Sequence, residues 1–322
     1  MRLGVIGILL STLIGAVVMF IILTIPMCWH IGLKLSVPKV KAMIIFGLPI
    51  IPAQLGAFVV HLSDRFFIKE FCSISEAGLY SLGYRFGGLP ASFLSDPFNQ
   101  IFQPRRFELY KQEGSSKIFG QIFTYFLLIM AFAGVSVAVL TYDILRIIAD
   151  EKFWSAAEIV PIIVLATTIF TFHYHVDLGI MIRKKTKYLA YINFSNAILV
   201  LSLNFLLIPR FGIYGAAYAT LIAFIYKICL TYYLSNRYYA IHFEFMRIIK
   251  ILCAAGLVYS AGAMIKVESV YISFIVKSVV VMIYPFILYL FGFYTNEEIQ
   301  KFWGYIKSRL IRAKGFLTGA GK

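Results

Sequence analysis

Residues 118–142 read IFGQIFTYFLLIMAFAGVSVAVLTY and carry no formal charge. A run of about 20 apolar residues is long enough for a helix to cross the hydrocarbon core of a bilayer. Across the 322 residues, 61% are hydrophobic, 14% are charged, and the mean hydropathy is +0.84. An ordinary soluble domain carries about 25% charged residues. The composition therefore excludes a soluble or disordered protein, and it excludes a nucleic-acid-binding module despite the net charge of +15.

Similar apolar stretches on both sides predict an all-α, multipass transmembrane helix bundle with about nine spans. The first stretch is too long for the apolar region of a signal peptide, and no small-x-small cleavage site follows it, so we expect it to stay in the membrane. The predicted spans are 4–26, 43–62, 78–104, 119–142, 159–181, 189–208, 212–235, 251–265 and 271–293.

These spans predict four parts of the chain. Residues 1–42 hold the first helix and a basic cytoplasmic loop, 43–236 hold six helices, and 237–293 hold two additional helices. Residues 294–322 form a basic tail in which Lys and Arg alternate with aromatic and aliphatic residues. That pattern is typical of an amphipathic helix lying on a membrane surface, so anionic lipids are expected partners. Residues 105–117 show a shorter version of the same pattern and are also expected to lie on the membrane surface.

The distribution of Lys and Arg predicts the orientation. The loops after the first, third, fifth and seventh spans and the tail hold 20 of them, whereas the N-terminus and the other loops hold 7. Cytoplasmic loops are enriched in these residues, which predicts a cytoplasmic C-terminus in the cell (inner) membrane and an outside N-terminus. An outside N-terminus without a signal leads us to expect an odd number of further spans before Met1. A nine-span protein with an exported N-terminus is the alternative.

The third predicted span carries an unusual number of polar side chains. On an ideal helix they share one face, and such a stripe should face water or protein because polar groups are costly in lipid. Pro90 and Pro97 are expected to kink the span, and Gly83 and Gly87 would allow a close helix approach. The polar residues are Ser81, Arg85, Ser92, Asp96, Asn99 and Gln103.

Arg85 is the main candidate for a functional residue, because a guanidinium cannot lose its charge. One interpretation is a cation that lines a cavity for an anionic substrate. The alternative is an arginine that snorkels, or that pairs with Asp64 or Asp96.

Other spans supply further candidates. In the second span Gln54, His61 and Arg65 share a face, and Asp64 beside Arg65 predicts a cap or gate salt bridge. Lys227 shares a face with two threonines, so it lines a cavity or snorkels. Lys277 is expected to snorkel, and Asn204 to hydrogen-bond between helices. The predicted substrate-binding residues are Arg85, Asp96, Lys227, His61, Gln54 and Asn99.

No motif for catalysis or for a cofactor was found. His173 and His175 are two residues apart and point to different faces of a helix, and no third metal ligand lies at a useful spacing. The four cysteines are scattered and form no metal-ligand or disulfide pattern. No P-loop and no nucleophile elbow are present. We therefore expect no enzymatic activity, no metal and no cofactor.

Three stretches resemble a known family. They are FGLPIIPAQLGAFVVHLSDRFFI (46–68) followed by EAGLYSLGYRFGGLP (76–90), and IRKKTKYLAYINFSNAILVLSLNFLLIPRFGIYGAAYATLIAF (182–224); EKFWSAAEIVPIIVLA (151–166) also fits. They are similar to bacterial polysaccharide (O-antigen, lipopolysaccharide) flippases of the multidrug/oligosaccharidyl-lipid/polysaccharide exporter superfamily. The resemblance covers roughly residues 43–236 and implies that they form a six-helix transporter lobe, the second lobe of such a protein.

The resemblance implies two lobes around a central cavity and translocation of an undecaprenyl-diphosphate-linked oligosaccharide. The second span would be the seventh helix of the family, so five helices would precede Met1. Arg85 resembles a cavity-facing basic position of related lipid II flippases, whereas Lys227, Asp96 and His61 rest on the helical-face argument alone. The implied partners are the lipid-linked oligosaccharide and other polysaccharide-assembly membrane proteins. Alternatives are a lipid II or multidrug exporter, a membrane-embedded polymerase or ligase, and a non-transporting scaffold.

Overall fold

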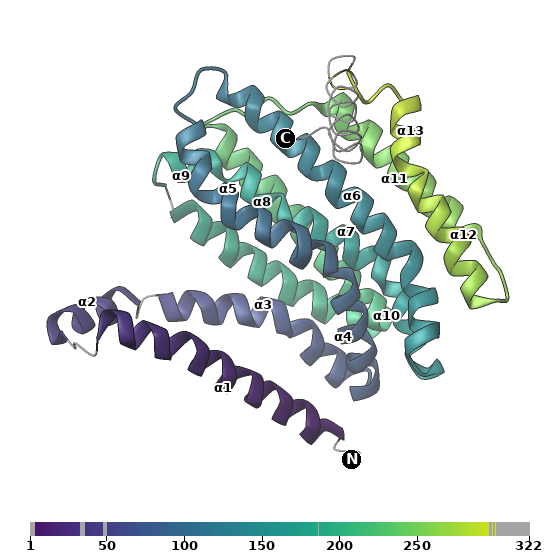
Figure 1. The fold of residues 1–322 in the computed structure, drawn as a ribbon, viewed down its shortest axis with the longest axis horizontal. Helices are drawn as coiled ribbons and strands as arrows, with labels where there is room; N and C mark the ends of the chain where they lie inside the picture. Colours follow the sequence, from purple (N-terminus) through teal and green to yellow (C-terminus); the bar gives the residue numbers. More distant parts are fainter. Residues whose placement is uncertain are drawn as a thin grey trace, which may run out of the picture. The chain divides into compact units, whose positions relative to one another are not determined.

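The computed structural model describes residues 4–32, 36–47, 50–185 and 187–295, together with residues 298 and 300. All regular secondary structure in these residues is helical, which confirms the all-α prediction. By their contacts the residues divide into two units, 1–55 and 56–322, which are described separately. Figure 1 gives the helix labels used below.

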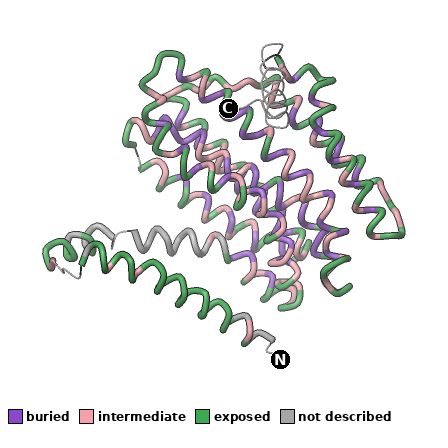
Figure 2. The backbone as a smooth tube through the Cα atoms, in the orientation of Figure 1, coloured by how far each residue is buried: buried purple, intermediate pink, exposed green. Residues whose placement is uncertain are grey.

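The first unit contains α1 (Gly4–Ile31), α2 (Val37–Gly47) and the start of α3 (Ile50–Phe71). Large apolar side chains along α1 are exposed, Phe20 and Trp29 among them, and its described residues are almost all coloured as exposed in Figure 2. A helix that is apolar all round is suited to lipid. The predicted first span therefore has a helical counterpart of sufficient length and hydropathy, Leu9–His30.

The predicted third span is broken in the structure. Ser73 caps α4 (Ile74–Gly87) by accepting a hydrogen bond from the Glu76 amide. A π-helical turn, η1 (Ala91–Ser95), follows Pro90, and α5 (Asp96–Leu109) then begins with Pro97 in its first turn. A proline removes one backbone donor and clashes with the preceding turn, which explains the break. The predicted kink is confirmed.

The other helices of the second unit pack around α7. In Figure 1 α6, α7 and α10 run side by side, and α7 packs on both of the others. Their buried faces meet in the middle of the second unit, where most purple segments of Figure 2 lie. The elements are α6 (Ser115–Ile148), the 3₁₀ segment η2 (Glu151–Ile159), α7 (Val160–Thr171), α8 (His173–Val176), α9 (Leu178–Ile182) and α10 (Lys187–Asn236).

Helix α10 is a hairpin of two antiparallel arms. Gly212 has φ 56° and ψ −135°, a conformation open mainly to glycine, and it reverses the chain there. The aromatic rings of Tyr188, at the start of α10, and Tyr238, just after its end, lie 6.2 Å apart. The two arms correspond to the predicted spans 189–208 and 212–235.

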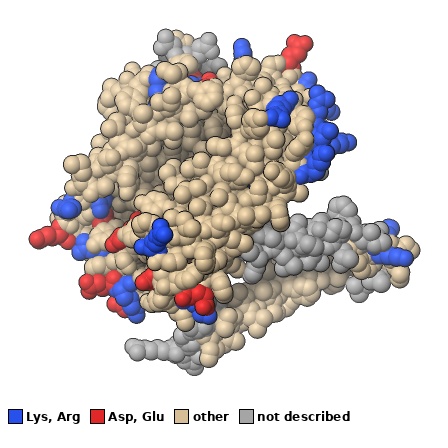
Figure 3. All heavy atoms as spheres, turned by 180° about the vertical axis from the view of Figure 1, so that it is seen from behind, with Lys and Arg blue, Asp and Glu red and all other residues tan. Residues whose placement is uncertain are grey.

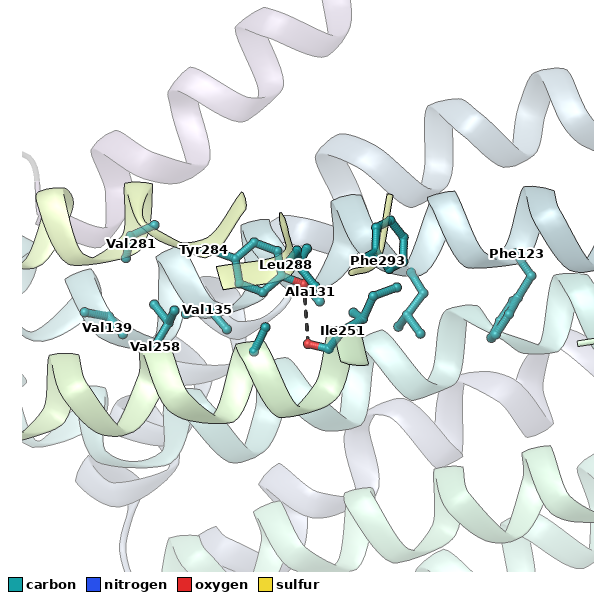
Figure 4. Close-up of a cluster of buried hydrophobic side chains, with 12 residues drawn as sticks. Phe123, Ala131, Val135, Val139, Ile251, Val258, Val281, Tyr284, Leu288 and Phe293 are labelled. Atoms are coloured by element: carbon teal, nitrogen blue, oxygen red, sulfur yellow. Dashed lines mark hydrogen bonds between the residues drawn. The ribbon is translucent and has the colours of Figure 1, made fainter. Parts of the chain in front are cut away.

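The last helices, α11 (Phe245–Met264), α12 (Val270–Met282) and α13 (Tyr284–Leu290), form a layer on α6. Figure 4 shows the cluster of buried apolar side chains that joins them. Within it the Tyr284 hydroxyl donates a hydrogen bond to the Ile251 carbonyl at 3.5 Å. These contacts tie the two additional helices to the lobe.

Six helices of the described residues are long and apolar enough to cross a membrane. This is fewer than the nine predicted spans for three reasons. The hairpin α10 counts once, the third predicted span is broken into shorter helices, and α3, the helix of the second predicted span, is not among the six. In Figure 3 charged side chains gather at the two ends of the second unit and leave a broad uncharged band between them. These features define a multipass helical membrane protein.

Two glycines set the rotation of α4. A Cβ on Gly83 would lie 2.7 Å from the Ala156 carbonyl oxygen, and one on Gly87 would lie 2.5 Å from Ile163 Cγ2. The glycine face is therefore in direct contact with η2 and α7, as predicted for a close helix approach. Residues on the opposite face of α4 must then point away from this contact.

Candidate substrate-binding site

A shallow polar groove lies along α5. It has a volume of about 340 Å³ and is lined by Asp96, Asn99, Gln100, Gln103 and Tyr174. Asn99 is buried and donates to the Ser95 hydroxyl at 2.9 Å, while its amide oxygen has no hydrogen-bond partner in the described residues. Such a set of carboxylate and amide groups around one groove is suited to a hydroxyl-rich or hydrated ligand.

Arg106 anchors the wall of this groove, a role that the sequence analysis missed. We expected residues 105–117 to lie on the membrane surface, but α5 runs to Leu109 and Arg106 is only 1% exposed. Its Nη1 donates to Asp177 Oδ1 at 2.7 Å and to the Tyr174 carbonyl at 2.8 Å. The expectation was wrong for Arg106. It lies three residues after Gln103, so it continues the polar face of α5, and here that face is covered by the protein rather than by the membrane surface.

Aromatic rings close the space beside the ion pair. His175 is buried, and its ring centroid lies 5.5 Å from that of Phe102 and 4.6 Å from that of Phe126. Its Nε2 and the Nε and Nη2 atoms of Arg106 have no hydrogen-bond partner within the described residues. The Arg106–Asp177 pair is therefore a buried connection between α5 and the α8–α9 turn, with part of its donor capacity unused.

Arg85 is exposed, and none of the described residues forms an ion pair or a hydrogen bond with it. Its direction follows from α4, whose Gly83 and Gly87 face the neighbouring helix. The alternative in which Asp64 neutralises Arg85 is not observed, since Asp64 pairs with Arg65. Arg85 does not line the groove, so the structure separates it from Asp96 and Asn99.

The predicted Asp64–Arg65 ion pair is present in α3. Arg65 Nη1 lies 2.9 Å from Asp64 Oδ1, and the Asp64 side chain is almost fully buried. The Arg65 guanidinium lies over the rings of Tyr84 and Tyr80, with distances to their centroids of 4.7 Å and 5.6 Å. Because α3 continues to Phe71, the pair is inside the helix rather than at its end. Its role as a gate stays a prediction.

The remaining candidates are only partly placed. The side chains of Gln54 and His61 lie outside the described residues, although both positions belong to α3. Lys227 is half-buried, and its Nζ lies 4.7 Å from the centre of the Phe170 ring. It contributes nothing to the groove along α5.

Two other polar groups in spans are accounted for by contacts between helices. Asn204 donates to the Ser63 hydroxyl at 3.2 Å, as predicted. Lys277 was expected to snorkel, which is wrong: it is 7% exposed, and its Nζ lies 2.8 Å from Asp143 Oδ2. A buried carboxylate opposite the ammonium explains the difference, because pairing makes burial of both charges tolerable.

A comparison with protein-family models matches residues 1–117 to a family described as "Polysaccharide biosynthesis protein". The matched region covers α1 to α5, including Arg85, the π-helical turn and every lining residue of the groove except Tyr174. The match supports a role in polysaccharide biosynthesis. No curated protein and no solved structure matches the chain.

Proposed function

We propose that the protein translocates an undecaprenyl-diphosphate-linked oligosaccharide across the cytoplasmic membrane during surface polysaccharide synthesis. A diphosphate with a sugar headgroup cannot cross hydrocarbon unaided, and a hydrated, polar path lowers that barrier. The observation that carries the proposal is that the broken α4–α5 segment carries polar groups in two separate places. It exposes the Arg85 cation on α4 and a groove of amides and a carboxylate on α5.

These two places suit the two parts of the substrate. The Arg85 guanidinium would hold the diphosphate, since it offers paired donors to phosphate oxygens. Asn99, Gln100 and Gln103 in the groove would exchange hydrogen bonds with sugar hydroxyls. The kink at Pro90 lies between them, where a change in helix angle would move one part relative to the other. We further propose the inner membrane as the location, with a cytoplasmic C-terminus.

The test compares Arg85→Ala with Arg105→Ala in the protein expressed from its native gene. Arg105 is also exposed and belongs to the same broken segment, so it is a matched control. We expect Arg85→Ala to lower surface polysaccharide roughly tenfold or more, which corresponds to losing a charge-assisted contact. Arg105→Ala should change it little, and both variants should reach the membrane in normal amounts. Wild-type polysaccharide levels in Arg85→Ala would refute the assigned site.

The position of the accumulated intermediate separates this proposal from a membrane-embedded polymerase or ligase. Loss of a flippase leaves the lipid-linked oligosaccharide on the inner leaflet, whereas loss of a polymerase leaves single repeat units on the outer leaflet. Accessibility of the sugar to an added lectin in right-side-out vesicles measures the difference. A drug exporter is favoured instead if Asp96→Asn, and not Arg85→Ala, changes the sensitivity of cells to cationic drugs.

A further inference from the structure

A cavity of about 600 Å³ lies apart from the groove, where the end of α6 meets η2, the start of α7 and the α11–α12 connection. Its size is within the range of small-ligand sites. Part of its wall is apolar, from residues such as Val139, Pro161 and Ala263, and three basic and three acidic residues also line it. The charged residues are Arg146, Lys266, Lys277, Asp143, Glu158 and Glu268.

Two of these charges neutralise each other. Lys277 Nζ lies 2.8 Å from Asp143 Oδ2, and the Ser273 hydroxyl donates to the same carboxylate at 3.0 Å and 3.1 Å. Asp143 is 1% exposed, and Lys277 is almost as deeply buried. The pair therefore forms a neutral part of the cavity wall and offers no net charge to a ligand.

Arg146 has no such partner. Its guanidinium lies 5.3 Å from the ring centre of Trp154 and 5.8 Å from that of Tyr142, so aromatic rings hold it in place. Its Nε is buried without a hydrogen-bond partner, and no carboxylate of the described residues pairs with it. A fixed guanidinium with unused donors at a cavity wall is suited to a phosphate group.

The carboxylates of the cavity argue against a purely anionic ligand. Glu158 is exposed and accepts a hydrogen bond from the Tyr214 hydroxyl, and Glu268 is exposed on the α11–α12 connection. Besides the neutral Asp143–Lys277 pair, the wall carries two basic residues, Arg146 and Lys266, and these two acidic ones. A ligand with negative charge alone would complement only the basic residues and would lie close to both carboxylates, which is unfavourable. A ligand that carries a phosphate and an ammonium would satisfy both signs.

We propose that this cavity binds the headgroup of a zwitterionic phospholipid with a primary amine, such as phosphatidylethanolamine. The phosphate would contact Arg146, and the ammonium would donate hydrogen bonds to Glu158 and Glu268. The predicted orientation places the end of α6 and the α11–α12 connection at the outer face of the membrane, where headgroups lie. Figure 3 shows charges of both signs at the end of the second unit where α12 begins. The inference does not rest on the proposed transport function.

Native mass spectrometry of the purified, delipidated chain tests the proposal with phosphatidylethanolamine, phosphatidylglycerol and phosphatidylcholine at equal concentrations. We expect one phosphatidylethanolamine to be retained preferentially, since the quaternary amine of phosphatidylcholine cannot donate a hydrogen bond. Arg146→Gln should lower this retention roughly tenfold or more. Glu158→Gln combined with Glu268→Gln should shift the preference towards phosphatidylglycerol.

Arg210→Gln is the matched control, because Arg210 is exposed on the same predicted face and does not line the cavity. Arg146→Lys guards against a folding defect: it should keep part of the binding and the thermal stability of the wild type. Equal retention of the three lipids by the wild type, or unchanged retention by Arg146→Gln, would overturn the proposal. Competition by soluble glycerophosphoethanolamine at equal concentration would overturn the assignment to a membrane lipid.

Discussion

The ion pair between Arg106 and Asp177 should be among the most sensitive contacts of the lobe. Arg106 is 1% exposed, and its Nη1 lies 2.7 Å from Asp177 Oδ1. Removing one member of a buried pair leaves the other charge without compensation and costs about 3–5 kcal/mol. The two single variants should differ, because a carboxylate can escape this cost by binding a proton and a guanidinium cannot.

We therefore expect Asp177→Leu to lower the free energy of unfolding by about 5 kcal/mol and Arg106→Met to lower it by about 3 kcal/mol. These values are the two ends of the range of about 3–5 kcal/mol. In Arg106→Met the orphaned Nε and Nη2 donors also disappear, which offsets part of the loss. The double variant should be close to the wild type, since apolar replacement of an imperfectly satisfied buried pair is often neutral or stabilising.

Thermal unfolding of the purified protein in detergent measures the order of the variants. The larger single loss should lower the midpoint by roughly 10 °C or more, at about 2–4 °C per kcal/mol for chains of this class. The control is Lys152→Met, because the Lys152–Asp150 pair is exposed and should contribute less than about 1 kcal/mol. A double variant less stable than both single variants would refute the reasoning, and so would an Arg106→Met midpoint equal to that of the wild type.

Two further predictions concern the neighbouring elements. Gly87→Ala should lower the free energy of unfolding of the protein by about 1–3 kcal/mol, because the new Cβ would lie 2.5 Å from a side-chain atom of α7. In the same unfolding assay Gly78→Ala should be neutral or stabilising, since nothing lies within 4 Å of its Cβ position in the same helix; equal losses would contradict the packing argument. Between α3 and α4, partial burial together with the Glu76 carboxylate raises the pKa of the Cys72 thiol. Less thiolate forms at a given pH, so maleimide should label Cys72 slowly at pH 8 and faster in Glu76→Gln; identical rates would contradict this.

The span prediction succeeded where one physical quantity decides the structure. Hydrocarbon thickness sets the length of an apolar helix, so the stretch around 118–142 predicted α6 without knowledge of its neighbours. The two arms of α10 were separable for a related reason. Pro209, Arg210 and Gly212 interrupt the apolar pattern where the chain reverses.

The side-chain partners were not predictable in the same way. The Arg106–Asp177 and Lys277–Asp143 pairs join helices that are far apart in the sequence. Helical periodicity gives the face on which a residue lies, but it does not say which other helix covers that face. Periodicity therefore placed Asp96 and Asn99 on one face, and both line the same groove, whereas Arg106 was misplaced and Lys277 was assigned to the membrane surface.

The contrast between Arg85 and Arg106 shows what the π-helical turn does. On an uninterrupted helix these two residues would lie about 60° apart, so both would face the same surroundings. In the structure Arg85 is exposed and Arg106 is buried against Asp177. The turn Ala91–Ser95 accommodates one more residue per turn than an α-helix, and with Pro90 it changes the rotation of α5 relative to α4. Gly83 and Gly87 fix the rotation of α4, and the Arg106–Asp177 ion pair fixes the rotation of α5. This division leaves the Arg85 side chain exposed, while Arg106 holds the segment in place through Asp177.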